Sequence, residues 1–284
     1  MKNFGIFFNP HYLDKGAIFK VLKVLHEEKD LNFFKFPEQS NILPEFIHTI
    51  KEKDQNKLDC LLSFGGDGTF LRTVKFSLKT KAPILGINLG KLGFLSESSV
   101  SELEKSIDDL IQNNYKVQKR LLLNASIKRD KEIIFSANAL NDAVLYKGEI
   151  PKLIDIRFYA NRRFVLETRC DGIIISTPTG STAYSLSAGG PIISPVMDAF
   201  IVTPLNPHIL SVRPMVFDAD DKLNYKITET DGSSYLQLDG VNSHSLKPDD
   251  EVIVTSASQK VNFIKLTNKT FFQILRKKLK MGKK

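Results

Sequence analysis

An alternation of strand-like and helix-like segments over the first hundred residues constrains the fold more than any other feature of the sequence. The helix-like stretches carry apolar residues three and four positions apart, and the strand-like stretches are short apolar runs. The expected strands are Phe4–Phe8, Asn32–Phe36, Leu58–Phe64 and Ala82–Ile87, and the expected helices are Ala17–Lys29, Pro44–Lys53, Phe70–Leu78 and Ser101–Asn113. Strands separated by helices of this length favour a parallel sheet with crossover connections.

The second half of the chain has a different pattern. From Leu121 onward the segments are short, alternate in polarity and are bounded by turns. The expected strands there include Asn124–Lys128, Ile154–Tyr159, Arg163–Glu167, Leu223–Thr228, Tyr235–Leu238 and Glu251–Thr255. A turn at Ala160–Arg162 predicts a hairpin, and the whole region indicates antiparallel sheets with one face exposed to water. Helical spacing returns only at Phe271–Leu279.

These patterns predict an α/β N-terminal domain with a parallel sheet and a C-terminal, mainly antiparallel β domain. We expect the first to span residues 1–118 and the second residues 119–265, with a C-terminal helix and basic tail over 266–284. The tail is expected to pack back on a domain or on a neighbouring subunit. A content of 42% hydrophobic and 25% charged residues excludes wholesale disorder. The longest apolar runs are far shorter than the roughly 20 residues of a membrane span, so no membrane partner is expected.

The net charge of +8 is concentrated at the C-terminus. Six lysines and arginines lie among the last nine residues, and without them the net charge is +2. A basic tail of this kind is most often a solvated terminus, so we expect no nucleic-acid partner.

Cys60 and Cys170 are too far apart in sequence for a zinc motif or a disulfide framework. The first ten residues lack a secretory signal, which favours the cytoplasm.

The sharpest local motif is Gly65–Thr69 (GGDGT), which follows the apolar strand Leu58–Phe64 and precedes a helix-like stretch. Such a turn directs backbone N–H groups and the positive end of a helix dipole at an anion, and its glycines let a phosphate approach closely. Asp67 costs electrostatic energy beside phosphates unless a metal, a cation or a proton-transfer role compensates it. The motif therefore predicts a phosphate site with an acid or base in it.

Two common nucleotide motifs are missing from the sequence. The segment Gly86–Lys91 has one residue fewer between its glycines than a P-loop, and Leu92 stands where a hydroxyl would bind magnesium. No Gly-x-Gly-x-x-Gly dinucleotide fingerprint occurs either. The five histidines show no spacing typical of metal ligands.

A second motif, Asp171–Pro191, joins a short apolar strand to a stretch rich in serine and threonine. Neutral hydroxyls and backbone N–H groups can hold ribose and phosphate oxygens at a low desolvation cost, although such a stretch can also simply cap a helix. Asn141-Asp142, before an apolar strand, is a third candidate, because an amide beside a carboxylate can bind a nucleobase or ribose. Taken alone, that pair is most often a turn.

Together these residues resemble the NAD kinase family. The matching segments are Gly65–Thr69, Gly86–Asn88, Gly93–Leu95, Asn138–Asp142, Asp171–Pro191, Asp198, Pro207-His208 and Arg213-Pro214. Gly-Gly-Asp-Gly alone also occurs in lipid kinases and phosphofructokinases, whereas the run Thr179–Gly190 separates NAD kinases from them.

The resemblance implies an NAD kinase-like sandwich in the second domain and a defined reaction. The γ-phosphoryl group of ATP is transferred to the 2′-hydroxyl of the adenosine ribose of NAD, giving NADP and ADP. NAD and ATP are then the substrates, the divalent cation is expected to be Mg²⁺, and the chain is expected to form a homodimer or homotetramer. No carboxylate cage dedicated to a metal is evident in the sequence, so no metal-ligating residue is assigned.

The resemblance also assigns the site residues. Asp67 matches the catalytic aspartate that accepts the ribose hydroxyl proton. The other expected contacts to NAD or ATP are Gly66, Gly68, Arg72, Asn141, Asp142, Lys152, Arg169, Asp171, Thr182, Ala183, Tyr184, Ser185, Leu186 and Ser187. Many relatives have Glu in place of Asp142 and Gln in place of Val241, so one carboxylate is a methylene shorter and one side-chain hydrogen bond is lost.

Two other classes of function fit parts of the pattern. A kinase of the same loop family with a lipid or sugar acceptor would share the GGDGT turn but has no use for the hydroxyl-rich run. A non-catalytic NAD-binding regulator would bind NAD without turnover and use its basic tail on nucleic acid, with an affinity that falls steeply with salt. Asp67 disfavours the regulator, because a pure binder has no need for an acid in the phosphate turn.

Overall fold

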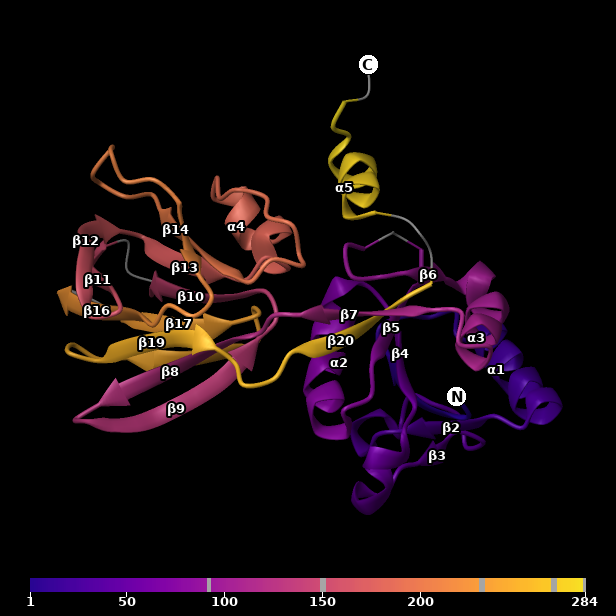
Figure 1. The fold of residues 1–284 in the computed structure, drawn as a ribbon. Coiled ribbons are helices and arrows are strands. Elements are labelled where there is room, and N and C mark those ends of the chain that lie inside the picture. The colour runs from indigo at the N-terminus through magenta and orange to yellow at the C-terminus, as the bar shows by residue number, and fades with distance from the viewer. Residues whose placement is uncertain (91–92, 149–151, 230–232, 267–269, 283–284) are drawn as a thin grey trace. The chain divides into compact units, whose positions relative to one another are not determined.

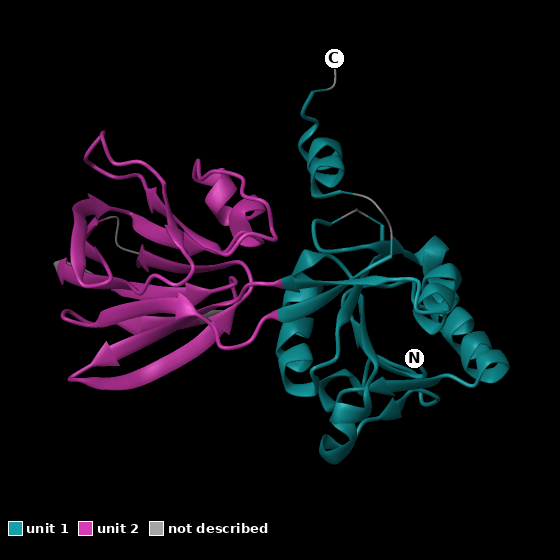
Figure 2. Ribbon diagram, in the orientation of Figure 1, with its two compact units in different colours: residues 1–119, 261–284 teal, residues 120–260 magenta. Residues whose placement is uncertain are grey.

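The computed structural model describes the chain except for residues 91–92, 149–151, 230–232, 267–269 and 283–284. The chain divides into two compact units, which are coloured separately in Figure 2. Unit 1 comprises Met1–Lys119 and Val261–Lys284, and unit 2 comprises Arg120–Lys260. Among the described residues, no helix is both long and apolar enough to span a membrane.

Unit 1 is built on a mostly parallel sheet with the strand order β3-β2-β1-β4-β5-β20-β7, and β6 also pairs with β5 (Figure 1). Its strands are β1 Asn3–Phe8, β2 Asn32–Lys35, β3 His48–Thr49, β4 Cys60–Phe64, β5 Ile84–Asn88, β6 Ser98–Ser99, β7 Lys116–Arg120 and β20 Val261–Lys265. The central strands β1, β4 and β5 pair in parallel register. They are buried almost throughout, which is why their sequences read as unbroken apolar runs.

The helices of unit 1 follow from the periodicity of their apolar residues. They are α1 Gly16–Lys29, α2 Asp67–Thr80, α3 Leu103–Ile111 and α5 Phe271–Leu279. Helix α1 buries Ile18, Leu22 and Leu25 and is capped after Lys29 by Asp30, which has a left-handed φ of 53°. Helix α5 begins after Thr270, whose hydroxyl accepts the Gln273 backbone N–H while the Gln273 side chain accepts the Thr270 N–H.

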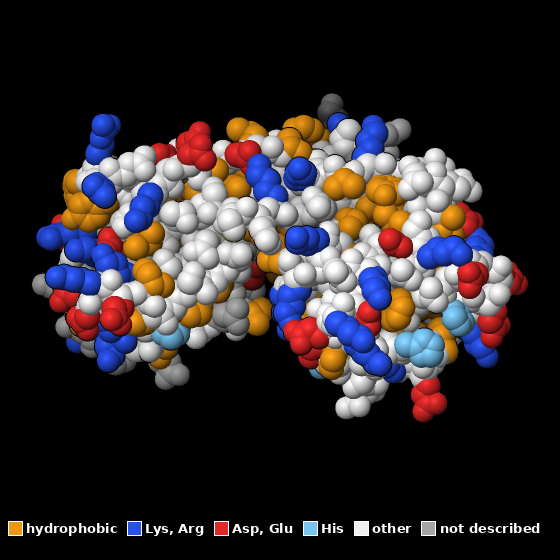
Figure 3. Space-filling model, turned by 60° about the horizontal axis from the view of Figure 1, so that its bottom comes forward, with side chains coloured by type: hydrophobic (Ala, Val, Ile, Leu, Met, Phe, Trp, Pro, Cys, Tyr) orange, Lys and Arg blue, Asp and Glu red, His pale blue; other side chains and the backbone are white. Residues whose placement is uncertain are grey.

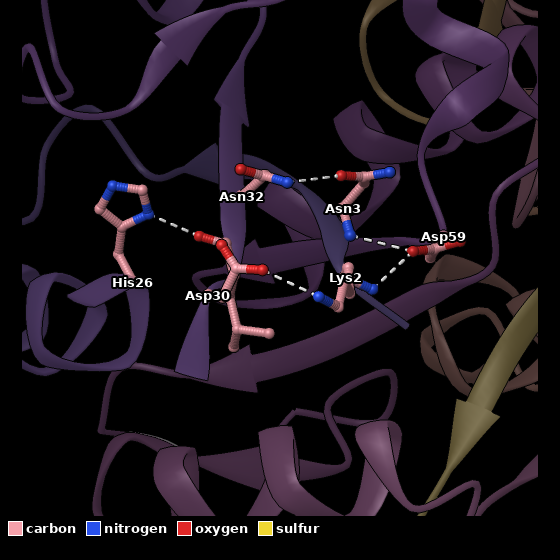
Figure 4. Close-up of polar contacts among 7 residues, drawn as sticks. Lys2, Asn3, His26, Asp30, Asn32 and Asp59 are labelled. Atoms are coloured by element: carbon pink, nitrogen blue, oxygen red, sulfur yellow. Dashed lines mark hydrogen bonds and ion pairs between the residues drawn. The ribbon is translucent and has the colours of Figure 1, made fainter. Parts of the chain in front are cut away.

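Polar contacts hold the beginning of β1 in place (Figure 4). The Asp59 carboxylate, just before β4, accepts the backbone N–H groups of Lys2 and Asn3 at 2.7 and 2.9 Å. The Asn32 amide donates to the Asn3 side chain at 3.0 Å, and the Lys2 ammonium pairs with Asp30. These bonds satisfy main-chain groups at the start of the strand and fix its register beside β2 and β4.

Unit 2 consists of two six-stranded antiparallel sheets with the orders β15-β14-β13-β10-β17-β18 and β12-β11-β16-β19-β8-β9. Strands of the first are β10 Asp142–Lys147, β13 Gly172–Ser176, β14 Ala199–Leu205, β15 Met215–Asp218, β17 Ser234–Leu238 and β18 Asn242–Leu246. Strands of the second are β8 Leu123–Arg129, β9 Glu132–Ala139, β11 Ile154–Ala160, β12 Arg163–Cys170, β16 Leu223–Glu229 and β19 Glu251–Ser256. A short helix, α4 Tyr184–Ser187, follows β13. Buried residues of both sheets form one hydrophobic core, so the expected sandwich of antiparallel sheets is confirmed.

The predicted hairpin at Ala160–Arg162 is confirmed. Asn161 and Arg162 both have positive φ, 51° and 67°, between the paired strands β11 and β12. Two left-handed residues in a two-residue loop are what the right-handed twist of the strands favours.

The helix predicted over Pro44–Lys53 is wrong. The segment instead contains β3, which pairs with β2 in the register Phe34↔His48, followed by a 3-10 helix at Glu52–Lys57. Ile47 and Ile50 are buried, as their helical spacing suggested. Pairing of His48 and Thr49 with the open edge of β2 outweighed the weak helical preference of this short, proline-initiated segment.

The end of the chain returns to unit 1 earlier than the expected boundary at residue 265. Strand β20 pairs in parallel with β5, in the register Phe263↔Ile84. Phe263 is buried, and its ring lies 4.6 Å from that of Phe70 in α2. A short strand such as Val261–Lys265 could by its residue types join either sheet, and its pairing with β5 places it in unit 1.

Candidate active site

The GGDGT turn connects β4 to α2, and helix α2 begins at Asp67 itself. A Cβ on Gly65 would lie 2.3 Å from Thr69 Oγ1, so only glycine fits there. Gly66 and Gly68 are exposed, with no atom near the place a Cβ would occupy. The positive end of α2 is thus open to an anion, as the sequence predicted for a phosphate site.

The Asp67 side chain is held by a segment far along the chain. Its Oδ2 accepts the backbone N–H of Phe94 at 3.0 Å, and its Oδ1 accepts that of Leu95, also at 3.0 Å. Gly93 lies so close that a Cβ there would be 2.1 Å from Asp67 Oδ1. The carboxylate is half-buried and ordered in one orientation by two main-chain donors.

Gly93, Phe94 and Leu95 are therefore part of this site, although they were not assigned to it from the sequence. The sequence comparison with the NAD kinase family included Gly93–Leu95 as a matching segment but assigned it no role. Because they act through backbone N–H groups and through the absence of a side chain, residue type carries no direct signal of their role. Arg72 is exposed on α2, one turn beyond Asp67.

In unit 2, the structure brings Asn141-Asp142 together with the hydroxyl-rich stretch. Asp142 begins β10 and pairs with Ser176 at the end of β13. The Thr177 N–H donates to Asn141 O at 2.9 Å, and a Cβ on Gly180 would lie 2.1 Å from the same oxygen. Two motifs separated by more than thirty residues in sequence thus form one surface.

Asp239 organises this surface from the turn between β17 and β18. Its carboxylate accepts the backbone N–H groups of Leu140, Asn141 and Asp142 at 2.8, 2.7 and 3.2 Å. Asp239 and Gly240 have positive φ, 48° and 70°, as a tight hairpin turn requires. Asp-Gly predicts the turn, but nothing local shows that the carboxylate binds three main-chain groups about a hundred residues earlier.

Asp142 is buried and lies in the field of a second carboxylate. Burial, and then repulsion from Asp239, raises the pKa of Asp142 to about 7. Burial also raises the pKa of Asp239, while its three backbone hydrogen bonds oppose that shift. A carboxyl with a pKa near 7 can either donate or accept a hydrogen bond at physiological pH.

The structure separates the hydroxyl groups of the second motif into two kinds. Ser185 is fully buried, and its Oγ lies 3.0 Å from Thr203 Oγ1; Ser181 is also buried and bonds to the Pro178 carbonyl. Tyr184 and Ser187 are exposed, and Thr182 is half-buried. Ala183 and Leu186 are half-buried as well. Ser185 is therefore placed to support the segment, and Tyr184, Ser187 and Thr182 are accessible to a ligand.

Three charged residues assigned from the sequence lie elsewhere on unit 2. The Asp171 carboxylate accepts the Asn206 amide and pairs with Lys147, and these two contacts hold the pKa of Asp171 below its usual range. Arg169 pairs with Asp155 at 2.9 Å, beside a hollow of about 430 Å³. Lys152 is exposed. Arg169 and Asp171 thus each pair with a different oppositely charged residue of unit 2, Asp155 and Lys147.

No group of three or more His, Cys, Asp or Glu side chains suited to a metal occurs among the described residues. Asp67 has one carboxylate, whose two oxygens each already accept one N–H. Such a site fits a cation carried on substrate phosphates and water, with at most one carboxylate from the protein.

Comparisons with known proteins agree across both units. The profile of the ATP-NAD kinase N-terminal domain matches residues 15–115, and that of the ATP-NAD kinase C-terminal domain matches residues 140–266. The chain is 40% identical to an NAD kinase of Carboxydothermus hydrogenoformans, over 82% of this chain and 83% of that one. It is 37% identical to an NAD kinase of Desulforamulus reducens, over 91% and 87% of the two chains.

Two solved structures share the fold. Yeast NADH kinase, crystallised with NADH, superposes with a TM-score of 0.89 at 28% identity, over 100% of this chain and 89% of that one. An NAD kinase from Archaeoglobus fulgidus, in complex with ATP, has a TM-score of 0.73 at 24% identity and covers 99% of both chains.

Proposed function

The chain belongs to the ATP-NAD kinase family, and we propose that the residues described above carry out the reaction of that family. The chain is an enzyme that transfers the γ-phosphoryl group of ATP to the 2′-hydroxyl of the adenosine ribose of NAD, giving NADP and ADP. The observation that carries the residue assignment is the Asp67 carboxylate, oriented by two main-chain donors at the N-terminus of α2.

Asp67 is proposed as the general base. As the ribose 2′-oxygen attacks the γ-phosphorus, its proton passes to the Asp67 carboxylate, and the bond from the γ-phosphorus to the bridging oxygen of ADP breaks. The Phe94 and Leu95 N–H groups keep the carboxylate in one orientation before the substrate arrives. General-base help contributes about 10²–10⁴-fold to rate, and positioning and charge neutralisation supply most of the rest.

The exposed backbone of Gly66 and Gly68 and the Arg72 guanidinium are proposed to contact phosphates. Their position at the first turns of α2 supports this, because main-chain N–H groups and a nearby cation suit an anion. Gly66 and Gly68 leave the space in which the phosphate would approach.

In unit 2, Asn141 and Asp142 are proposed to bind the adenosine half of NAD. Two observations support this assignment. Asp142 pairs with Ser176 beside the hydroxyl-rich segment, and the Asp239 carboxylate accepts the backbone N–H groups of Asn141 and Asp142. Thr182, Tyr184 and Ser187 would offer accessible hydroxyls, with Ala183 and Leu186 lining the same segment and Ser185 supporting it through Thr203. Asp171, Arg169 and Lys152 remain proposed polar contacts to NAD.

A kinase that uses ATP requires a divalent cation, and we propose Mg²⁺. When bound, the cation would neutralise charge on the transferred phosphoryl group. Asp67 is the only carboxylate among Gly65–Thr69, so substrate phosphates and water would supply most of the Mg²⁺ coordination.

We also propose that the enzyme is a cytoplasmic homodimer or homotetramer without a nucleic-acid or membrane partner. On the face shown in Figure 3, lysine and arginine side chains are interspersed with aspartate and glutamate, which suits neither a nucleic acid nor an anionic bilayer. Sedimentation equilibrium of the purified protein measures the oligomeric state, and a monomer would contradict this part of the proposal.

The first experiment incubates the purified protein with NAD, ATP and Mg²⁺ and measures NADP with an NADP-specific coupled dehydrogenase. Asp67→Asn is measured in parallel, because the amide keeps the shape of the side chain but cannot take the proton. We expect NADP from the wild type, and turnover about 10²–10⁴-fold lower in Asp67→Asn with little change in NAD affinity. Equal turnover in the two proteins would refute the base assignment.

A further inference from the structure

One lysine of the C-terminal helix, Lys278, is exposed but stands at helical spacing from the helix's covered residues. Leu275 is buried and Ile274 half-buried, which marks the covered face of α5. Lys278 follows Leu275 by three positions and Ile274 by four, and residues at these spacings share a helix face. Lys277 lies one position earlier than Lys278 and so points about 100° away around the helix.

Lys278 contacts the side chain of Phe94, the residue whose backbone binds the proposed general base. The Lys278 ammonium is 4.8 Å from the centre of the Phe94 ring, within the range of a cation–π contact. The backbone N–H of Phe94 in turn donates to Asp67 Oδ2. All three residues belong to unit 1.

The phosphate turn needs positive charge from outside itself. Among Gly65–Thr69 the single charged residue is Asp67, and it is negative. A triphosphate placed at this turn gains from cations that offset both its own charge and that of Asp67. Arg72 is one candidate from α2, and Lys278 is a second from a helix about two hundred residues later.

We propose that Lys278 is a binding residue for the phosphate chain of the donor nucleotide. This inference rests on the proposed role of the GGDGT turn in the kinase reaction. Stacking on Phe94 orders the long lysine side chain while leaving its ammonium solvent-accessible, so the charge is available to a phosphate oxygen. The basic C-terminal segment then contributes to the active site through this lysine.

The test compares Lys278→Met, Lys278→Arg and the matched control Lys277→Met. Methionine keeps an apolar stem over Phe94 but removes the charge, and arginine keeps the charge. We expect Lys278→Met to raise the KM for ATP about five- to tenfold with the KM for NAD unchanged, as for the loss of one partly exposed charged contact. Lys278→Arg should restore most of the affinity for ATP, and Lys277→Met should behave like the wild type.

A purely structural role for Lys278 gives a different result. If Lys278→Met lowers the melting temperature while the KM for ATP stays unchanged, or raises the KM values for ATP and NAD equally, the proposal is overturned. The proposal is also overturned if Lys277→Met raises the KM for ATP as much as Lys278→Met does. The effect would then come from the net charge of the tail and not from the position of Lys278.

Binding of tripolyphosphate, measured by calorimetry, keeps this inference separate from the proposed function. If the wild type forms no NADP, the proposed function fails, and the Lys278 assignment is decided by whether Lys278→Met weakens tripolyphosphate binding. If NADP forms and Lys278→Met binds ATP and tripolyphosphate like the wild type, the Lys278 assignment alone fails.

Discussion

The chemistry of Asp67 is apparent from its neighbours in sequence, but its orientation is not. An acid between glycines, after a strand and before a helix, indicates proton transfer at a phosphate site. The donors that orient the carboxylate are the N–H groups of Phe94 and Leu95, which lie 27 and 28 residues later. A base is effective only when it is held in a productive geometry, so this second segment matters as much as the aspartate.

Gly93→Ala tests how much the held orientation contributes. The new methyl group would lie 2.1 Å from the present position of Asp67 Oδ1, so the carboxylate must move. Since it is the end of a side chain that moves, we expect a small change in melting temperature and a fall in kcat of about 10–100-fold. Thermal unfolding and coupled-assay kinetics measure the two effects.

The control for that variant is Gly16→Ala, at the start of α1, where a new Cβ meets no atom within 4 Å. It should leave kcat unchanged. Wild-type kcat in Gly93→Ala would show that the orientation of Asp67 is not set by this close approach.

Asp142 makes the protein less stable as pH rises, which is the opposite of the usual effect of a carboxyl whose pKa is lowered by folding. Its pKa rises from 3.8 in the unfolded chain to about 7 when folded, so between these values the folded state holds the proton more tightly. The contribution of Asp142 to stability is fully present below about pH 4 and is lost as pH rises through 7. Asp142→Asn, which cannot ionise, should therefore be more stable than the wild type at pH 8 by about 4 kcal/mol.

The free energy of urea unfolding at pH 5 and pH 8 measures this difference. Taking wild type minus variant at each pH cancels the carboxyls with lowered pKa, such as Asp171 and Asp250, whose stabilisation is lost as pH falls. A wild-type-minus-variant difference that is the same at both pH values would contradict a raised pKa at Asp142.

For individual helices and strands, the local sequence pattern indicates the type of element but not the partner with which a strand pairs. The periodicities of α1 and α5 predict their bounds within a residue, because an amphipathic face is a local property. The segment Pro44–Lys53 has a similar spacing of apolar residues but forms β3 instead, because the open edge of β2 lies beside it. Similarly, β20 at Val261–Lys265 was not among the strands predicted from the sequence, and its place beside β5 depends on a sheet formed by the first ninety residues.

At the scale of the whole molecule, the two units differ in how the chain builds them. Unit 2 is one continuous segment, Arg120–Lys260, with its own hydrophobic core. Unit 1 is completed by Val261–Lys284 after the chain leaves unit 2. A continuous segment with a complete core is expected to fold by itself, whereas Met1–Lys119 lacks the β20 strand of its sheet.

Expressing residues 120–260 and residues 1–119 separately tests this difference. We expect the first to unfold cooperatively on heating, with strand-rich circular dichroism, and the second to be at least several kcal/mol less stable than unit 1 in the full chain, because Phe263 and its contact with Phe70 are missing. Calorimetry measures both transitions. An unfolded 120–260 fragment would show that unit 2 depends on unit 1.

From the sequence one could predict the elements with strong local patterns, the antiparallel character of the second half, the phosphate turn and the identity of the proposed base. These properties depend on residues within about one helix or one hairpin of each other, so one sequence is enough to predict them. The folded structure was needed to show which sheet β20 joins, that Asp239 binds the backbone of Asn141-Asp142, and that Ser185 is buried against Thr203 while Ser187 is exposed. Each of these depends on contacts between distant segments, where residue types allow many partners and only packing and hydrogen bonding across the fold select one.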